Sequence, residues 1–438
     1  MRKTPKRSPG AARSRPDEHR VHRRLQARLH GPQRGRGCRW AVVLAAFVLA
    51  AQAFISRPAS TPYPLSYPTY YGHRINIPTN NPLTVEGVAL GRRLFYERRL
   101  SANNTVSCGT CHIQRFAFTD GRRFSIGFDG TPTKRNAMSL ANELWVRNFF
   151  WDGRAASLET QAVTPLTDPH EMGQSLDSSA LKLRASDKPQ TLDKSQTSDK
   201  SRESGRLPAS GSYAEAFSAA FGSPDITPDR IVRAIAQFER TLISADAPYD
   251  RYLRGEYRFT PAEQQGYNLF FGGSSPAAPT IASSPSALAV AGTAGSSSAP
   301  ASAVRSAGCA NCHGGPRTLT ETYHNNGLDS VFTDPGREAV TGMAYDRGRF
   351  RVVTLRNIAL TGPYMHDGRF ATLPEVLDHY SGHIAGGPTL SPTLRDSVGR
   401  PVLLHLTDIE KKALLAFLNT LTDSTFITDP RFSDPKIN

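Results

Sequence analysis

The sequence is poor in cysteine, with five among its 438 residues. Cys38 lies in a basic N-terminal segment, and the other four form two C-x-x-C pairs, each followed by histidine. Because all four belong to these two C-x-x-C-His runs, we expect none of them to form a structural disulfide.

Long apolar runs are also lacking. The run from Trp40 to Phe54 has 15 residues, fewer than the roughly 20 that a membrane-spanning helix needs. It follows a strongly basic segment and ends in Ala51-Gln-Ala53, a small-x-small pattern typical of signal-peptide cleavage. We interpret residues 1–53 as a basic leader with an export signal, and an uncleaved membrane anchor is the alternative. The expected location is therefore the periplasm.

Beyond the leader there is little excess charge of either sign. Residues 1–39 hold 13 Lys and Arg against two acids, which leaves +4 of the net +15 for the rest. The high pI therefore does not indicate nucleic-acid binding by the folded part. A nucleic-acid-binding tail would be a second interpretation of the basic arm, but the apolar run behind it favours export.

No convincing alternation of apolar and polar residues marks a β-strand, and we predict a mainly α fold. Helix starts are indicated at Thr84, at Thr227-Pro228 and at three capping boxes that begin with Thr260, Thr372 and Thr407. After Thr227, apolar residues recur with helical spacing, which predicts one buried helix face.

Two segments are too poor in large apolar residues to order. Residues 184–212 are charged and rich in serine, and 29 of the 36 residues from 272 to 307 are Gly, Ser, Ala or Pro. We expect both to be disordered insertions within a folded chain.

The chemistry is carried by Cys108-Gly-Thr-Cys111-His112 and its second copy, Cys309-Ala-Asn-Cys312-His313. In a C-x-x-C-H run the two thiols can form thioethers to the vinyl groups of one haem, and the histidine becomes the proximal iron ligand. A redox C-x-x-C or half of a zinc site is the alternative, but neither copy has a second C-x-x-C as partner. The sequence therefore predicts two covalently bound haem c groups.

Several further stretches, taken with the two haem motifs, resemble the bacterial di-haem cytochrome c peroxidase/MauG family. The likeness extends from about residue 80 to 425 and is broken by the two insertions. The matching stretches are Gly91-Arg-Arg-Leu-Phe-Tyr, Arg99-Leu-Ser, Ser125-Ile-Gly, Arg135-Asn136, Phe150-Trp-Asp-Gly-Arg154, Gln237-Phe-Glu-Arg-Thr241 and Leu355-Arg-Asn-Ile-Ala-Leu-Thr-Gly-Pro-Tyr-Met-His-Asp-Gly368.

The resemblance implies two cytochrome c-like haem domains packed together. The expected organisation is a leader at 1–53, an extended lead-in at 54–82, a peroxidatic haem domain at 83–246 with the insertion 184–212, an electron-transfer haem domain at 247–425 with the insertion 272–307, and a tail at 426–438.

At the first haem, the position that matches the family's distal acid is Glu159, eight residues after Trp151. A carboxylate there can relay a proton between the two peroxide oxygens. Conventional peroxidases of the family carry a blocking histidine straight after Ser-Ile-Gly, where this chain has Phe128, so we expect a first haem that is open without prior reduction. Phe149 stands where relatives often have a glutamine.

At the second haem, the family position for the distal ligand lies 14 residues after His366 and is Tyr380 instead of methionine, as in the MauG-like branch. A phenolate is a harder donor than a thioether and lowers the reduction potential of the iron. The residues leave other ligands open, namely Met343, Met365, His379 and His383.

The resemblance also implies a calcium ion between the haems, at positions that match Asn136, Thr361 and Pro363 and that offer side-chain or backbone oxygens. The first functional interpretation is reduction of hydrogen peroxide to water, with electrons from a small c-type cytochrome or another redox protein. A MauG-like oxidase that modifies a partner protein is the second, and a plain electron-transfer cytochrome is the third.

Overall fold

The computed structural model describes residues 60–187, 211–272 and 306–436. The predicted leader and export signal lie outside the described residues, as do most of the two low-complexity segments. The described ends of those segments are regular, because Arg184 to Ser186 complete helix α5 and Ser212 caps helix α6. Among the described helices, none combines the length and the apolarity needed to cross a bilayer.

The described chain is mainly helical, as predicted, and its two strands are only two residues long. The strands β1 (Tyr323–His324) and β2 (Phe350–Arg351) pair antiparallel. The helices are α2 (Val85–Phe95), α3 (Cys108–Cys111), α4 (Leu158–Thr167), α5 (Leu176–Ser186), α6 (Tyr213–Phe221), α7 (Pro228–Glu239), α8 (Pro248–Leu253), α9 (Pro261–Phe271), α10 (Glu338–Thr341), α11 (Leu373–Gly382), α12 (Asp408–Asn419) and α13 (Ser424–Thr428).

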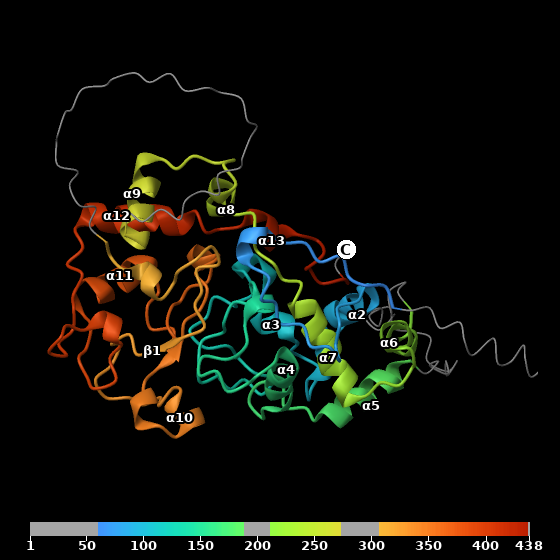
Figure 1. The fold of residues 1–438 in the computed structure, drawn as a ribbon. Helices are drawn as coiled ribbons and strands as arrows, with labels where there is room; N and C mark the ends of the chain where they lie inside the picture. The colour runs from blue at the N-terminus through green and yellow to red at the C-terminus, as the bar shows by residue number, and fades with distance from the viewer. Residues whose placement is uncertain (1–59, 188–210, 273–305, 437–438) are drawn as a thin grey trace, which may run out of the picture. The chain divides into compact units, whose positions relative to one another are not determined.

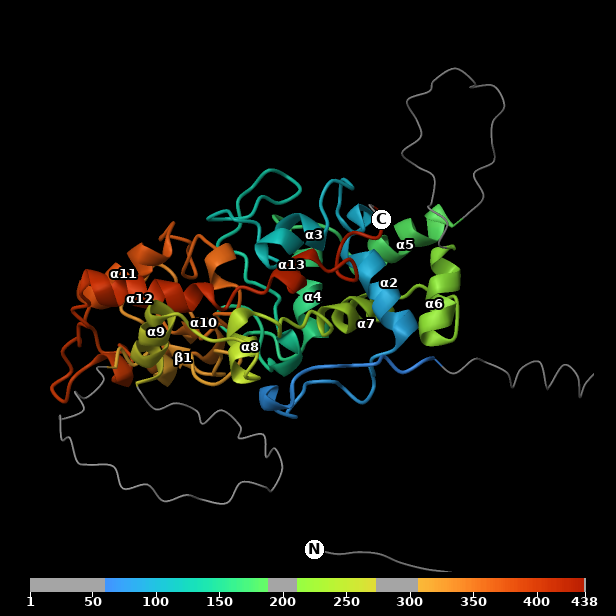
Figure 2. The same cartoon turned by 90° about the horizontal axis from the view of Figure 1, so that it is seen from above.

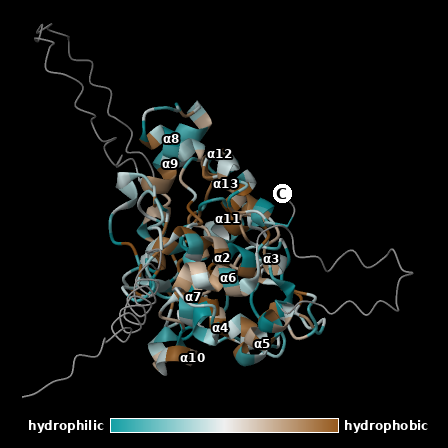
Figure 3. Ribbon diagram, turned by 90° about the vertical axis from the view of Figure 1, so that its right-hand side faces the viewer, coloured by the Kyte–Doolittle hydropathy of each residue, from teal (hydrophilic) through white to brown (hydrophobic). Residues whose placement is uncertain are grey.

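Each predicted cap begins a helix. The hydroxyls of Thr84, Thr227, Thr260, Thr372 and Thr407 accept a backbone N–H from the first turn of α2, α7, α9, α11 and α12. Three of these, on α9, α11 and α12, are complete capping boxes with a glutamate. The helices carry both hydrophilic and hydrophobic residues in Figure 3, as amphipathic helices do.

Two helix crossings repeat each other. A Cβ on Gly91 of α2 would lie 1.9 Å from the carbonyl oxygen of Ala234 on α7, and a Cβ on Gly266 of α9 would lie 1.9 Å from that of Ala413 on α12. Only glycine permits so close an approach of two helix backbones. Figures 1 and 2 show α2 with α7 and α9 with α12 as separate pairs.

A loop is repeated as well. The segments Phe149–Ala155 and Tyr364–Phe370 each close on themselves through an antiparallel bridge, and each contains Asp-Gly-Arg. Phe150 and Met365 have positive φ at matching places, 68° and 76°. A capped helix follows each loop, α4 and α11 respectively. The chain is therefore built from two copies of one helical unit, each with one C-x-x-C-H run.

Polar contacts join the two copies. Arg135 donates to Asp152 at 2.6 Å in the first copy and to Asp334 at 2.7 and 2.8 Å in the second. The C-terminal residues return to the first copy, where Phe426 and Phe432 are buried in the core that α2, α6 and α7 share. The residues predicted as a tail are thus partly core.

Candidate functional site

The first haem motif forms the short helix α3, and His112 follows its last residue. His112 Nδ1 lies 2.7 Å from the carbonyl oxygen of the buried Phe118. Since a carbonyl only accepts, Nδ1 carries the hydrogen and Nε2 is left with a free lone pair. Burial lowers the pKa of His112, so the ring is neutral. Cys108 and Cys111 are not joined in a disulfide, so both sulfurs remain available for thioether bonds to a haem.

The second motif repeats this arrangement. His313 Nδ1 lies 3.1 Å from the carbonyl oxygen of Val353, which fixes the same tautomer. Burial lowers the pKa of His313 to about 4, so this imidazole is also neutral and can donate its Nε2 lone pair to iron. Cys309 and Cys312, which are likewise not joined in a disulfide, line the same cavity as this histidine.

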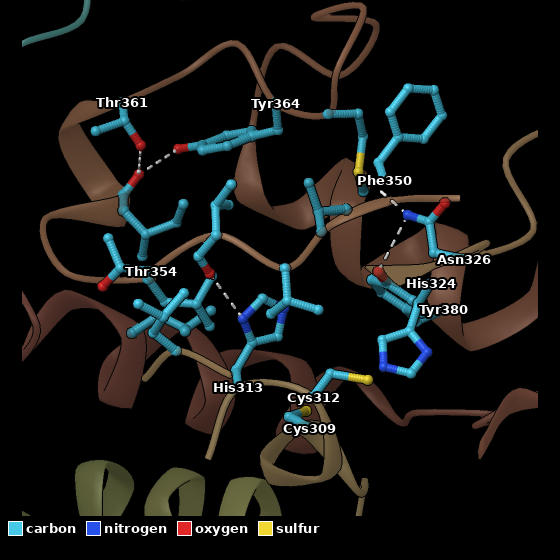
Figure 4. A pocket seen from close by; sticks show the side chains of 18 of the residues that line it. Cys309, Cys312, His313, His324, Asn326, Phe350, Thr354, Thr361, Tyr364 and Tyr380 are labelled. Atoms are coloured by element: carbon cyan, nitrogen blue, oxygen red, sulfur yellow. Dashed lines mark hydrogen bonds between the residues drawn. The ribbon is translucent and has the colours of Figure 1, made fainter. Parts of the chain in front are cut away.

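A mostly apolar cavity of about 300 Å³ adjoins the second motif (Figure 4). Cys309, Cys312 and His313 lie in its wall together with aliphatic side chains from α11 and α12, among them Leu377 and Leu414. An apolar space with two thiols and one neutral imidazole on its wall fits a covalently held porphyrin.

Tyr380, on α11, lies in the same cavity (Figure 4). Its hydroxyl accepts a hydrogen bond of 3.3 Å from Asn326 Nδ2, which also approaches the Met365 sulfur at 3.4 Å. Burial raises the pKa of Tyr380 to about 12. The phenol is therefore protonated unless a cation stabilises the phenolate.

Of the four other candidate ligands for the second haem, Met365 alone lines the cavity. Met365 lines the cavity, whereas Met343 is 52% exposed on the surface. His379 Nε2 is 3.0 Å from the carbonyl oxygen of Asn326, and His383 is exposed. Tyr380 and Met365 are thus the two candidates that share the cavity with His313.

Glu159 lies in the first turn of α4, and its side chain points to α7. Arg240 donates to both carboxylate oxygens, at 2.7 and 2.9 Å, and Asn81 Nδ2 donates to Oε1 at 2.7 Å. Burial raises the pKa of Glu159, but the pair with Arg240 and the bond from Asn81 outweigh it, so the pKa is lowered overall. Glu159 is therefore ionised and can accept a proton.

The loop that carries Phe128 packs against the segment from Glu171 to Gly173. Phe128 N donates to the carbonyl oxygen of Glu171 at 2.9 Å, and the ring lies so close to Gly173 that a Cβ there would be 2.2 Å from it. Phe149, at the position where relatives often have glutamine, is buried in an apolar cluster with Leu158 and Ala236.

The three residues of the predicted calcium site border the same cavity. Asn136 Nδ2 donates to the carbonyl oxygens of Arg122 and Arg123, at 2.8 and 3.3 Å, and its backbone oxygen accepts from Trp151 Nε1 at 2.9 Å. Within the described residues no three His, Cys, Asp or Glu side chains gather as a metal site. A cation there would depend on amide and backbone oxygens, which calcium accepts.

Sequence reasoning missed two residues of this site. Arg240 belongs to the stretch Gln237 to Thr241, but nothing in that stretch indicates that its guanidinium pairs with the Glu159 carboxylate. Asn326 belongs to the run Tyr323-His-Asn-Asn-Gly-Leu, which by itself indicates no role, and only the fold brings its amide to Tyr380.

Known proteins resemble this chain over most of its length. A family model described as di-haem cytochrome c peroxidase matches residues 85–258. The methylamine utilization protein MauG of Methylorubrum extorquens is 33% identical over 382 residues, which cover 85% of this chain and 84% of the relative. Cytochrome c551 peroxidase of Nitrosomonas europaea is 33% identical, covering 68% of this chain and 73% of the relative.

A solved structure agrees with these relatives. The crystal structure of a MauG-like protein associated with microbial copper homeostasis is 36% identical, with a TM-score of 0.66, and covers 85% of this chain and 99% of that one. The chain belongs to the di-haem cytochrome c peroxidase and MauG family, and it is a peroxidase-type oxidoreductase whose family carries two haem c groups.

Proposed function

We propose that this protein reduces hydrogen peroxide to water at the haem held by His112, with electrons that enter through the haem held by His313. The observation that carries this proposal is the difference between the two copies. In the second copy Tyr380 and Met365 share a cavity with the proximal histidine, whereas in the first copy Phe128 offers no ligand atom. The copy without a distal ligand suits substrate, and the copy with one suits electron transfer.

When bound, the haem of the first copy supplies the iron at which peroxide is reduced. The protein supplies proton handling, because Glu159 is held as a carboxylate by Arg240 and can take a proton from one peroxide oxygen and return it to the other. Asn81 and Arg240 together fix the direction of that carboxylate. His112 keeps its lone pair available through the bond from Nδ1 to Phe118.

The reaction consumes two electrons and two protons for each peroxide. We infer that the electrons come from a small c-type cytochrome or another redox protein. The test is steady-state oxidation of a reduced small cytochrome c by hydrogen peroxide. Two equivalents oxidised per peroxide would support the proposal, and no oxidation of any such donor would contradict it.

A second candidate function is MauG-like oxidation of a residue in a partner protein. Tyr380 in the cavity and Phe128 in place of the blocking histidine favour it, and MauG proteins are among the similar sequences. Under this alternative, the spectral change caused by peroxide would persist for many seconds without an electron donor. The peroxide-treated protein would then oxidise a protein substrate.

Two finer features belong to the same proposal. The family resemblance and the placement of Asn136, Thr361 and Pro363 on one cavity support a calcium ion between the haems. Chelation would then lower the melting temperature of the wild type, and Asn136→Ala would remove that response. The leader at 1–53 supports export to the periplasm, where membrane attachment depends on whether the signal is cleaved.

A further inference from the structure

Two buried carboxyl groups have no part in the mechanism above. Glu143 is the first residue of a short 3₁₀ turn (Glu143–Trp145), and Glu239 is the last residue of α7. They are 6% and 4% exposed, and each has its Oε2 buried without a hydrogen-bond partner. An ionised carboxylate in such a place is costly, whereas a protonated one is much less so.

The backbone holds the two residues on adjacent segments. Asn142 N donates to the carbonyl oxygen of Leu242 at 2.8 Å, and Leu242 N donates to that of Glu239 at 3.1 Å. Backbone hydrogen bonds through Leu242 therefore connect Asn142, the neighbour of Glu143, to Glu239. Its side chain lines the cavity that also holds His313 and Tyr380.

Glu239 belongs to the first copy and precedes the partner of Glu159. The next residue, Arg240, directs its Nη atoms at Glu159 and its Nε at the carbonyl oxygen of Asn76, 2.9 Å away. Glu239 is near enough to Cys108 of the first haem motif to raise the pKa of its thiol, to which burial contributes most. The pair thus spans from the second-haem cavity to the neighbourhood of Glu159.

The charges around the pair do not offset the effect of burial on the two pKa values. Burial raises the pKa of Glu143 to about 7, and Glu321 adds to the rise while Arg351, 4.0 Å away, opposes it. Burial raises the pKa of Glu239 to about 8, and Glu143 and Glu159 add to the rise while Arg240 opposes it. At neutral pH the pair therefore keeps at least one proton.

We propose that Glu143 and Glu239 form an internal proton store that connects the second-haem cavity to Glu159 and supplies protons for peroxide reduction. The inference rests on the proposed function. In that reaction the O–O bond of hydrogen peroxide breaks and two O–H bonds form. Two electrons come from the reduced donor protein. Both protons pass through the carboxyl groups of the store, which take up replacement protons from bulk water.

The store acts through Glu159, so Glu143 and Glu239 are positioning residues that do not touch peroxide. The experiment uses the haem-loaded protein and the variants Glu143→Gln and Glu239→Gln, which keep shape but cannot release a carboxyl proton. Glu256→Gln is the matched control, because Glu256 is 54% exposed, pairs with Arg254 at the surface and does not contribute to the pKa of either carboxyl group.

The first readout is the infrared absorption of protonated carboxyl groups between pH 5 and pH 9, measured without peroxide. The wild type should show carboxyl bands that disappear with midpoints near 7 and 8, and each glutamine variant should lack one of them. The control should keep both. Bands that are unchanged in both variants would overturn the proposal. If one variant does not fold, a wild-type spectrum without carboxyl bands that titrate in this pH range would overturn it as well.

The second readout is the pH profile of peroxide reduction. We expect kcat of the variants to fall about 10-fold or more with little change in KM, and the alkaline fall of the wild-type profile to be lost. An unaltered profile would contradict proton supply by this pair. A wild type that reduces no peroxide would contradict the proposed function instead, while the infrared result would still report whether the pair holds protons.

Discussion

Arg240 and Glu159 form a two-pronged ion pair, Nη1 to Oε1 at 2.7 Å and Nη2 to Oε2 at 2.9 Å. The Arg240 side chain is fully buried and that of Glu159 is 18% exposed. Two parallel charge-assisted bonds fix the plane of the carboxylate as well as its charge. Helix α7 therefore determines both the direction and the protonation state of the acid on α4.

Replacement of Glu159 tests its role in proton transfer. Glu159→Gln should lower the rate of reaction with hydrogen peroxide by about 10²- to 10⁴-fold, because the amide cannot accept the peroxide proton. Rapid-mixing absorbance measures this rate. Glu215→Gln is the control, since Glu215 is an exposed capping glutamate in the first turn of α6. Equal rates in wild type and Glu159→Gln would exclude the residue from the reaction.

The partner of Glu159 is open to a separate test. Arg240→Ala leaves the partly buried carboxylate without its cation and should cost about 3–5 kcal/mol in the free energy of unfolding. Because Arg240 lowers the pKa of Glu159, its loss should also shift the acid limb of the rate profile to higher pH. Denaturant titration and the pH–rate profile measure the two effects, and an acid limb that stays in place would contradict the pairing.

Phe128 is expected to keep the first haem open. Phe128→His introduces an imidazole at the position that blocks the oxidised haem in conventional relatives. The oxidised variant should react with peroxide much more slowly, and reduction before mixing should restore its rate. Phe128→Leu should behave like the wild type, and slow reaction in both variants would indicate a packing effect instead.

The ligand of the second haem can be assigned by comparing the two residues that share the cavity. Tyr380→Phe removes the phenolate oxygen and should raise the midpoint potential of that haem and alter its electron paramagnetic resonance spectrum. Met365→Leu should change neither property appreciably. The reverse pattern would identify Met365 as the ligand.

The local features of the fold were readable from the sequence. Thr84, Thr260, Thr372 and Thr407 cap helices as predicted, because a capping hydroxyl acts on the backbone within three residues. The haem motifs could also be predicted, because their residues are adjacent in the sequence. The close helix crossing at Gly91 was not predicted, since a glycine in a helix does not say which backbone will approach it.

The polar network of the site was not readable in this way. Arg240 is 81 residues from Glu159, and Asn326 is 54 residues from Tyr380, so only tertiary packing brings them together. Glutamate is usually exposed, and nothing near Glu239 in the sequence indicates its burial. The packing of two copies of one unit decides these contacts, and that packing has no local signal.

The two buried carboxyl groups predict how stability changes with pH. The pKa values of Glu143 and Glu239 are raised on folding to about 7 and about 8, so the stabilisation linked to them is present at low pH and is lost as pH rises through those values. The free energy of unfolding should therefore fall by on the order of a few kcal/mol between about pH 5 and pH 9. Denaturant titrations measure this slope, and Glu239→Gln should flatten it. An equal slope in that variant would contradict the burial of a protonated carboxyl group.

The central claim is that the first haem is open in the fully oxidised protein and reacts with peroxide. The measurement that tests it most directly is rapid-mixing absorbance of the fully oxidised protein with stoichiometric hydrogen peroxide and no prior reduction. We predict a fast and sizeable change in the haem bands. An unchanged spectrum would contradict it, because a sixth ligand would then occupy the first haem, and the protein would be either reductively activated or an electron carrier.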